Sequence, residues 1–304
     1  MIIGIIGTPN KDTLILPNRR KVSSWGGITY NILTLSHYLK TSGTVRVICP
    51  VGVNERSDLL SILQRFSNID VRGIKSVSQR QNRVILKCTS PEEKEETADL
   101  TLLPLPFDSI APFLSDLDFL LVNFTSGRDI EKDTLRKIRD TYQGPILVDV
   151  HSLTLGDPDS RGRRRLRSFH DWRDWLLDMD YVQLAWIEVG SLCDEGRATF
   201  AGAVEAADWL LERGTKGVII TLGEKGAYYF YADEFGILKD EIPPFPLQTV
   251  VDTTGCGDVF SAAFVYSILI GKSGVEAAKF ASRAAALKAT FSGLMPWLSD
   301  DGAQ

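Results

Sequence analysis

The sequence predicts an α/β fold in which a mostly parallel β-sheet is covered by helices on both faces. From about residue 119 onward, apolar runs of strand length alternate with segments of helix length, and this alternation is typical of parallel sheets. Two polar, β-rich segments, 13–24 and 69–103, lie before this regular region and predict a small sheet that projects from the body. A chain of 304 residues can form one large domain with such an appendage. We therefore expect a single domain over residues 1–304.

The individual elements are assigned from apolar periodicity and from the turn-forming residues between segments. In the first third, expected strands cover residues 2–6, 13–16, 45–49, 69–74 and 83–88, and expected helices cover 26–40 and 56–66. Later strands are expected at 119–122, 146–150, 181–184, 217–222, 227–231 and 245–251. Later helices are expected at 130–142, between 150 and 181, and at 198–213, 259–270 and 274–291. The charged run 90–97 is expected to be a solvated loop or hairpin tip.

Composition and charge exclude several classes of protein. A net charge of −5 argues against a general nucleic-acid binder, and no apolar stretch is long enough to span a bilayer. The N-terminal residues lack the basic region of a signal peptide. Four widely spaced cysteines without a C-x-x-C pair indicate reduced thiols and a cytoplasmic protein. The three histidines show no zinc-ligand spacing.

The segment 252–258, Asp-Thr-Thr-Gly-Cys-Gly-Asp, lies between an expected strand and an expected helix. Gly255 and Gly257 let the backbone come close to a ligand, and the amides of residues 255–258 would lie at a helix N-terminus, which favours an anion. Asp258 beside an anion site indicates phosphoryl transfer to a hydroxyl, in which amides hold the transferring group and an aspartate accepts the proton. The alternative is that Asp258 only caps the helix.

Thr221, Gly223 and Gly226 form a candidate nucleotide-binding turn after the expected strand 217–222. Glycine at the carboxyl edge of a parallel sheet allows the close approach that a nucleotide needs. A hairpin turn uses the same residue types, so both interpretations remain open. The segment 271–273, Gly-Lys-Ser, is not a P-loop, because the required earlier glycine is absent and no strand directly precedes it. The N-terminal glycines do not form a dinucleotide fingerprint either.

Two further groups of residues are candidates for substrate binding. Asn10 and Asp12 follow the first expected strand, where short polar side chains either bind sugar hydroxyls or form an ordinary turn. Gly26 and Gly27, with Asn31 in the following helix, either admit a ligand at the start of that helix or mark its boundary.

The stretch 151–180 contains the densest positive charge of the chain, in the run 161–167, Arg-Gly-Arg-Arg-Arg-Leu-Arg. These guanidinium groups either grip a substrate phosphate or, as we expect, lie in a solvated loop before a helix. Trp172 and Trp175, spaced i and i+3, are expected to pack in the core rather than to stack on a base.

Together these segments resemble the ribokinase-like carbohydrate kinases of the phosphofructokinase-B type along nearly the whole chain. The segment 252–258 is similar to the C-terminal signature of that family. The resemblance implies that Asp258 is the catalytic base, and that the amides of Gly255, Cys256, Gly257 and Asp258 form the anion hole for the transferring phosphate. It also implies a ribokinase-like fold, whose small sheet is a lid that closes over the sugar and often forms a dimer contact.

The same resemblance implies the substrate-binding residues. Asn10 and Asp12 match the N-x-D element that binds substrate hydroxyls. Gly26 and Gly27, with Asn31, match the double-glycine segment of the family. Ribokinases proper carry a lysine directly after this glycine pair, where the present chain has isoleucine, so the resemblance does not imply ribose as the substrate.

For the cofactors, the resemblance implies ATP, Mg²⁺ and, in potassium-activated members, K⁺. ATP would bind at the strand end 221–226. Glu188 belongs to the element of the magnesium and phosphate environment, in which Ala185 stands where the family carries asparagine. Because Mg²⁺ keeps waters and phosphates as most of its ligands, this change bears on efficiency more than on fold. Asp252 and Thr254 match positions that contribute to a monovalent-cation site.

The sequence therefore predicts a cytoplasmic kinase that uses ATP to phosphorylate a hydroxyl of a sugar or sugar-like molecule. The alternatives are a nucleoside kinase, which aromatic lid residues would favour, and a catalytically weak sensor or regulatory protein, which the change at Ala185 supports. The expected partners are a small-molecule substrate and a second copy through the lid, with neither nucleic acid nor a membrane. Cys256 either carries an activated thiol or, as we expect, only fills a small space.

Overall fold

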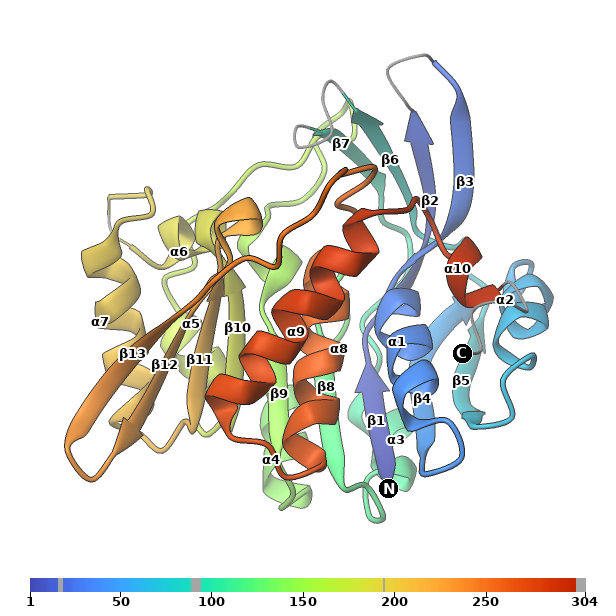
Figure 1. The fold of residues 1–304 in the computed structure, drawn as a ribbon. Coiled ribbons are helices and arrows are strands. Elements are labelled where there is room, and N and C mark those ends of the chain that lie inside the picture. The colour runs from blue at the N-terminus through green and yellow to red at the C-terminus, as the bar shows by residue number, and fades with distance from the viewer. Residues whose placement is uncertain (16–18, 89–93, 194, 299–304) are drawn as a thin grey trace.

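The computed structural model describes residues 1–15, 19–88, 94–193 and 195–298. Its centre is a sheet of nine strands in the order β13-β12-β11-β10-β9-β8-β1-β4-β5 (Figure 1). Neighbouring strands from β11 to β5 pair in parallel, and β12 and β13 add an antiparallel hairpin at one edge. The strands are β1 Ile2–Ile6, β4 Thr44–Gly52, β5 Ile69–Val77, β8 Phe119–Asn123, β9 Ile146–Asp149, β10 Tyr181–Ala185, β11 Gly217–Thr221, β12 Ala227–Asp233 and β13 Gly236–Ile242.

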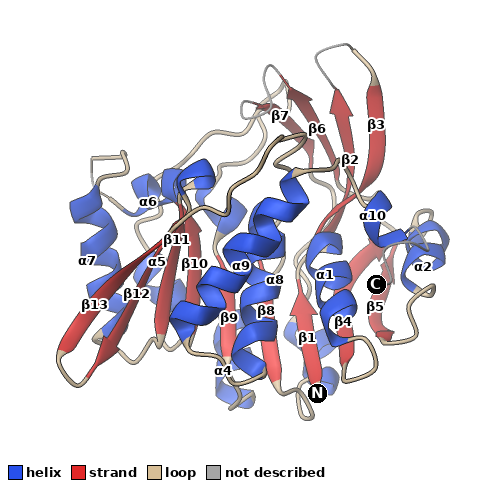
Figure 2. Ribbon diagram, viewed as in Figure 1, coloured by secondary structure: helices blue, strands red, loops and turns tan. Residues whose placement is uncertain are grey.

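Helices cover both faces of this sheet (Figure 2). One face packs against α1 Thr29–Leu39, α2 Arg56–Leu63, α8 Cys256–Leu269, α9 Gly274–Ala289 and α10 Met295–Leu298. The other packs against α3 Phe107–Ile110, α4 Lys132–Thr141, α5 Trp172–Leu176, α6 Trp186–Leu192 and α7 Phe200–Leu211. Short 3₁₀ turns lie at Ala111–Phe113, His151–Thr154 and Gly223–Lys225.

The burial of both faces explains why the central strands are so apolar. Successive side chains of a strand point to opposite faces. In β8, Phe119 and Leu121 therefore enter one core cluster, whereas Leu120 and Val122 enter the other. A strand that is buried on both faces appears as a continuous apolar run. This is the pattern from which the parallel sheet was predicted, and the prediction is confirmed.

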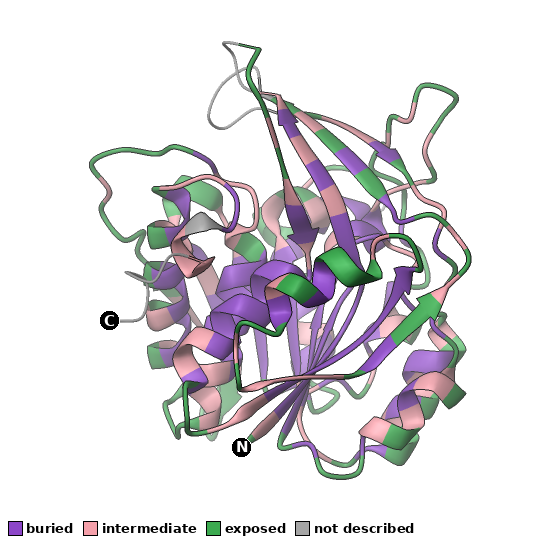
Figure 3. Cartoon of the chain, turned by 90° about the vertical axis from the view of Figure 1, so that its right-hand side faces the viewer, coloured by how far each residue is buried: buried purple, intermediate pink, exposed green. Residues whose placement is uncertain are grey.

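A second sheet, in the order β3-β2-β6-β7, projects beyond the carboxyl ends of the central strands (Figures 1 and 3). Its strands are β2 Pro9–Ile15, β3 Lys21–Gly27, β6 Arg83–Cys88 and β7 Lys94–Asp99. The strand β2 directly follows β1, and β3 leads into α1. The small sheet is thus attached at the point where the first central strand ends.

The projecting sheet differs in detail from its predicted segments. Strand β2 begins at Pro9 rather than at residue 13, so Asn10 and Asp12 lie in a strand and not in a turn. Residues 69–77, expected in the small sheet, form the edge strand β5 of the large one, paired with β4. An edge strand is only partly buried, and β5 therefore lacks the apolar run of a central strand. Residues 16–18 and 89–93, which include the first half of the predicted charged run 90–97, lie outside the described residues. The second half of that run, residues 94–97, belongs to strand β7.

The expected strand 245–251 is wrong. Residues 243–251 have no regular secondary structure, because Pro243, Pro244 and Pro246 have no N–H group to donate to a sheet. The strand that precedes the signature is β13, which was not predicted. It is an exposed edge strand, so its sequence carries little apolar signal. The segment 252–258 is therefore a turn that leads from a loop into α8.

The arginine-rich run lies in an excursion, residues 155–167, that reaches the small sheet (Figure 1). The N–H of Ala98 in β7 donates to the carbonyl oxygen of Gly162 at 2.7 Å. The side chain of Arg164 is only 4% exposed, and its guanidinium donates to the carbonyl oxygen of Ser126 at 2.9 Å. The other arginines of the run are exposed. The expected solvated loop is therefore confirmed except at Arg164, which holds the excursion against the body.

The tryptophans of this region pack as predicted. Trp172 is buried, with its ring 5.2 Å from that of Trp209, and Trp175 packs edge-on against Phe124. Within the part of the chain that the structure describes, no helix is long and apolar enough to cross a membrane.

Candidate active site

Polar side chains gather where the central strands end, beneath the small sheet. Asn123 ends β8, Asp149 ends β9 and Thr221 ends β11. The carboxyl ends of parallel strands meet at one edge of the sheet, and α8 begins at this edge. Gln183 in β10 connects the two, since its amide nitrogen donates to the carbonyl oxygen of Gly257 at 3.0 Å and to Asp149 at 2.8 Å.

Asp258 lies in the first turn of α8 with 5% of its surface exposed. Its Oδ1 accepts a hydrogen bond from the Asn123 amide at 2.7 Å. Burial raises the pKa of the Asp258 carboxyl, whereas His151, the Asn123 amide and Lys288 lower it. The net shift is upward, so the carboxylate accepts a proton more readily than an exposed aspartate does, as a catalytic base requires.

Asn31, which was predicted to bind the substrate, forms hydrogen bonds within the protein. Asn31 is fully buried, and its amide nitrogen donates to the carbonyl oxygen of Asp258 at 2.8 Å and to Ser261 Oγ at 3.0 Å. Its amide oxygen accepts from Asn123 at 3.0 Å. All of its polar atoms are used within the protein. Asn31 therefore fixes α8 against α1 and orients Asn123, which in turn orients the Asp258 carboxylate.

The N-terminus of α8 offers free backbone amides beside this carboxylate. Among the described residues, the N–H groups of Gly255, Gly257 and Asp258 meet no acceptor. The N–H of Cys256 points back to the carbonyl oxygen of Thr253 at 3.2 Å, so the predicted anion hole lacks the Cys256 amide in this structure. The remaining amides and the helix dipole favour a bound anion.

Gly255 and Gly257 have different structural roles in this turn. Gly255 has a φ of +81°, and a Cβ there would lie 2.6 Å from the ring of Tyr30. Only glycine fits that position. Gly257 has ordinary helical space around it, because a Cβ would meet a single heavy atom within 4 Å, the Gln183 Nε2 at 4.0 Å. Gly257 also lines the cleft in front of α8, so its missing side chain keeps that cleft open.

The small sheet supplies the opposite wall of the site. The carboxylate of Asp12 lies directly over Gly26, where a Cβ would come within 1.7 Å of Asp12 Oδ2. Burial, together with the carboxylates of Asp258, Glu96 and Asp252, raises the pKa of Asp12 well above its usual value.

Asn10 and Gly27 share this wall with Asp12. The amide oxygen of Asn10 is buried and accepts no hydrogen bond from the described residues, and buried polar atoms of this kind call for a ligand or water. Gly27 has a φ of +57°, with the carbonyl oxygen of Thr8 at 2.3 Å from its Cβ position. Its role is therefore to shape the end of β3.

His151 was missed by the sequence analysis, although it lies among the acidic residues of the site. It follows β9 with a φ of +39°, which is unusual for a residue other than glycine. Burial lowers the pKa of His151, but the carboxylates of Asp258, Asp149 and Glu188 outweigh this effect and raise it. The cationic form of this imidazole is thus more favoured beside the proposed base than in a free histidine. Its position directly after a strand that ends in Asp149 was the only signal in the sequence.

A cleft of about 680 Å³ extends from the α8 N-terminus to the end of β11. It brings the predicted nucleotide-binding residues Thr221, Gly223 and Gly226 together with Gly257. Apolar side chains form much of its wall, namely Leu222, Phe245, Leu247, Val250, Phe260, Ala285, Ala286 and Ala289. Gly226 has a φ of +91°, and a Cβ there would lie 2.1 Å from the Ile242 carbonyl oxygen. The cleft has the volume and the mixed lining of a nucleotide pocket.

The predicted metal residues lie near this cleft, but they do not form a complete protein cage. Glu188 accepts a hydrogen bond from the N–H of Ala185 at 2.8 Å, and burial raises its pKa to about 7. The described residues contain no group of three acidic, histidine or cysteine side chains that could hold a metal ion. This donor set fits a Mg²⁺ ion that keeps waters and phosphates as ligands.

The other predicted cation ligands lie behind the α8 turn. Asp252 is buried, and its Oδ1 accepts from the N–H of Thr254 at 2.9 Å. The ammonium group of Lys288 lies 3.4 Å from the Asp252 carbonyl oxygen.

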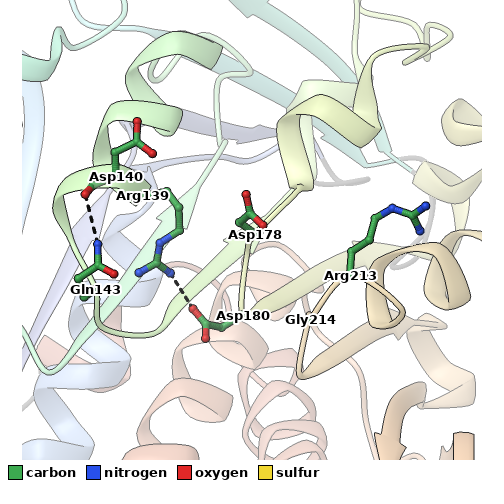
Figure 4. Close-up of a pocket in the computed structure, with 7 residues that line it drawn as sticks. All are labelled: Arg139, Asp140, Gln143, Asp178, Asp180, Arg213 and Gly214. Atoms are coloured by element: carbon green, nitrogen blue, oxygen red, sulfur yellow. Dashed lines mark hydrogen bonds and ion pairs between the residues drawn. The ribbon is translucent and has the colours of Figure 1, made fainter.

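A second hollow of about 460 Å³ lies at the amino ends of the strands, away from this site (Figure 4). Arg139 pairs there with Asp180 at 3.0 Å, and Asp180 also pairs with Lys216 at 2.8 Å. Arg139 and Asp180 of this hollow are therefore paired within the protein.

The C-terminal part of the chain matches a known protein family. Residues 174–300 match the model of the pfkB family carbohydrate kinases. A ribokinase of Arabidopsis thaliana is 36% identical over 157 residues, which are 51% of this chain and 37% of the relative. The chain thus spans little more than a third of the length of this curated relative.

Solved structures extend the likeness to the whole fold. A ribokinase from Thermotoga maritima superposes with a TM-score of 0.75 at 23% identity, over 98% of this chain and 95% of that one. Arabidopsis thaliana ribokinase complexed with ribose and ATP gives 0.71 at 19%, over 99% and 96%. A Burkholderia thailandensis nucleoside kinase in complex with inosine gives 0.72 at 18%, over 96% and 92%. The chain has the ribokinase fold.

Proposed function

Because residues 174–300 match the pfkB family carbohydrate kinases and the chain has the ribokinase fold, we propose that it transfers the terminal phosphoryl group of ATP to a hydroxyl of a sugar or sugar-like molecule. The observation that carries the proposal is the placement of Asp258. A buried carboxylate with a raised pKa lies beside free amides at a helix N-terminus. Such amides hold the transferring group while the carboxylate takes the proton of the attacking hydroxyl.

The acceptor would lie between α8 and the small sheet. Asp12 and the unpaired amide oxygen of Asn10 are hydrogen-bond acceptors, and a polyhydroxylated molecule offers several donors to them. With Asp12 on one side and Asp258 on the other, one hydroxyl is directed at the base while neighbouring hydroxyls hold the ring. Holding both reactants in this geometry supplies much of the rate enhancement in phosphoryl transfer.

The donor would occupy the cleft that ends at Gly257. Its apolar walls suit a purine ring, and its glycines at 223 and 226 suit close approach of the nucleotide. Glu188 would hold the waters of a Mg²⁺ ion, which neutralises the charge of the phosphates when bound. The cationic form of the His151 imidazole would add positive charge on the same side.

A sugar is favoured over a nucleoside by the composition of the lid. Trp25 is the only aromatic residue in segments 9–27 and 83–99, which hold the four strands. It is buried, and its indole N–H donates to Asp58 in α2 at 3.0 Å, with the Lys11 ammonium 4.0 Å above the ring. Trp25 is thus committed to packing. A base would find no aromatic surface of the lid on which to stack.

The test is the release of ADP from Mg·ATP with a panel of free sugars, sugar phosphates, polyols and nucleosides. Asp258→Asn keeps the side-chain volume and an oxygen that can accept from Asn123. We expect this variant to lose roughly 10²–10⁴-fold in turnover without a lower melting temperature, because a buried charge is removed. Asp133→Asn changes an exposed carboxylate in the first turn of α4 and serves as the matched control.

Three outcomes separate the hypotheses. Turnover with one sugar class, lost in Asp258→Asn and kept in Asp133→Asn, supports the proposal. Turnover with nucleosides alone would transfer the assignment to a nucleoside kinase. If a sugar raises the melting temperature yet no donor is consumed, the chain is a sensor or regulatory protein instead.

A further inference from the structure

Lys288 is a charged residue in the core of the protein. It lies in the last turn of α9, and its side chain is 1% exposed. Lysine is almost never buried to this degree unless its ammonium group is paired. The ammonium of Lys288 donates to the carbonyl oxygens of Phe291 at 3.1 Å and of Asp252 at 3.4 Å. It also lies 5.4 Å from the centre of the Tyr30 ring, and that ring packs against Gly255.

The surroundings of this ammonium are rich in oxygen atoms. The N–H groups of Val251 and Asp252 donate to the carbonyl oxygen of Ala289 at 2.8 and 3.1 Å. Ser292 Oγ donates to Asp252 Oδ2 at 3.1 Å. The loop before α8 and the loop after α9 are thus held together, with the Lys288 ammonium between their carbonyl groups. Carbonyl, carboxylate and hydroxyl oxygens are the ligands that hard monovalent cations take from proteins.

The position of this charge matters for the proposed reaction. Asp252, Asp258 and Asp12 are three buried carboxylates, and the carboxylates of Asp258 and Asp252 raise the pKa of Asp12. His151, the Asn123 amide and, to a smaller extent, Lys288 lower the pKa of Asp258. Lys288 therefore offsets part of the repulsion between these carboxylates, and it places positive charge behind the turn whose amides face the phosphate site.

We propose that Lys288 is a built-in cation that takes the place of a bound monovalent ion behind the anion hole. The residues present do not fit a separate K⁺ at Asp252, because the Asp252 and Phe291 carbonyl oxygens already accept from the ammonium. Phosphoryl transfer by this chain then needs no added potassium. The kinetic part of this inference rests on the proposed function, whereas the structural part does not.

The wild-type protein provides the first test. Its melting temperature without ligands and its rate of donor consumption are compared in about 100 mM KCl and in tetramethylammonium chloride at the same ionic strength. Tetramethylammonium is too large to enter the site. We expect the rates to agree within about twofold and the melting temperatures to agree within about 1 °C. A potassium-specific rise of roughly tenfold in rate, or of several degrees in melting temperature, would overturn the proposal.

Two variants test the charge directly. Lys288→Ala removes the ammonium and leaves room for an ion, whereas Lys288→Met removes the charge but fills the space with its side chain. In tetramethylammonium chloride we expect both to lose roughly tenfold or more in turnover. K⁺ or NH₄⁺ should restore part of the rate of Lys288→Ala and raise its melting temperature, but should leave Lys288→Met unchanged. Lys279→Ala, an exposed lysine of the same helix, should behave as the wild type throughout.

The outcomes distinguish this inference from the proposed function. Wild-type turnover by both variants without potassium would overturn the role of Lys288 while leaving the kinase assignment intact. If no acceptor leads to donor consumption, the kinase assignment fails. The melting temperatures then still test whether Lys288 takes the place of a bound cation. Stabilisation of Lys288→Ala by K⁺, without stabilisation of the wild type, supports the built-in cation, and an equal response of both proteins refutes it. If neither variant folds, the wild-type comparison alone decides.

Discussion

Gly257→Ala should separate activity from stability more sharply than any other single change in the site. The added methyl group meets only Gln183 Nε2, at 4.0 Å, within the protein, so the fold accepts it. Alanine is favoured over glycine in a helix by about 0.5–1 kcal/mol. The variant should therefore melt at the wild-type temperature or up to roughly 3 °C higher.

The same methyl group should reduce turnover, because it projects into the cleft at the amides that would hold the transferring phosphate. Losing one hydrogen bond to a charged group costs about 1.5–3 kcal/mol. At 1.36 kcal/mol per decade this corresponds to a fall of roughly 10- to 150-fold in kcat/KM. ADP release and differential scanning fluorimetry measure the two effects on the same sample.

Gly255→Ala is the matched comparison. Here the methyl group would lie 2.6 Å from the Tyr30 ring at a φ of +81°, so stability and activity should fall together. If Gly257→Ala keeps its turnover within about twofold of the wild type, the amides of this turn do not face the phosphate, and the assignment of the anion site is refuted.

The remaining predictions concern protonation and access. Because burial raises the pKa of Asp258, the plot of kcat/KM against pH should rise with an apparent pKa above the usual aspartate range. An apparent pKa within that usual range would contradict the role of Asp258 as base. The pKa of Glu188 is raised from 4.5 to about 7 in the folded state, so its ionisation disfavours folding, and stability should fall as pH rises from about 4.5 to 7. Glu188→Gln should therefore gain melting temperature relative to the wild type across that window, and a constant difference would refute the shift. Gly26→Ala must displace the Asp12 carboxylate, so KM for the acceptor should rise more than KM for ATP, which titrations of each substrate would measure. Cys256 lines the donor cleft, and ATP should slow its alkylation as followed by mass spectrometry; equal rates with and without ATP would place the nucleotide elsewhere.

The parts of the fold that were predictable are those whose signal is local. Strands buried on both faces form apolar runs, and the two glycines around Cys256 mark a tight turn before α8, so the central sheet and the position of Asp258 followed from the sequence. The edge strands β5 and β13 were misassigned or missed, because a strand exposed on one side has no such run. The segment 245–251 was predicted as a strand despite the prolines in and before it, although their missing N–H groups exclude a strand there.

The parts of the site that were not predictable depend on contacts between distant segments. Asn31 looks like a ligand residue in the sequence, yet its amide is used by Asp258 and Asn123, which lie 227 and 92 residues away. Lys288 appears as one more lysine of an amphipathic helix, and only the folded chain shows that it is buried against Asp252. The pKa of His151 is raised by carboxylates on three other elements, which its local sequence does not reveal. Local patterns identify which residues can react, whereas the tertiary structure decides which of them are committed elsewhere.

The backbone hydrogen bond between Ala98 and Gly162 has a consequence for the behaviour of the protein in concentrated solution. A free outer strand presents a row of unpaired N–H and C=O groups, on which another chain can assemble. The excursion 155–167 reaches β7 (Figure 1) and forms one antiparallel bridge with it, between Arg163 and Thr97. Its exposed arginines add charge repulsion at the same border of the small sheet. The excursion therefore hinders the pairing of β7 with a strand of another molecule. Its removal should lower the concentration at which the protein begins to aggregate.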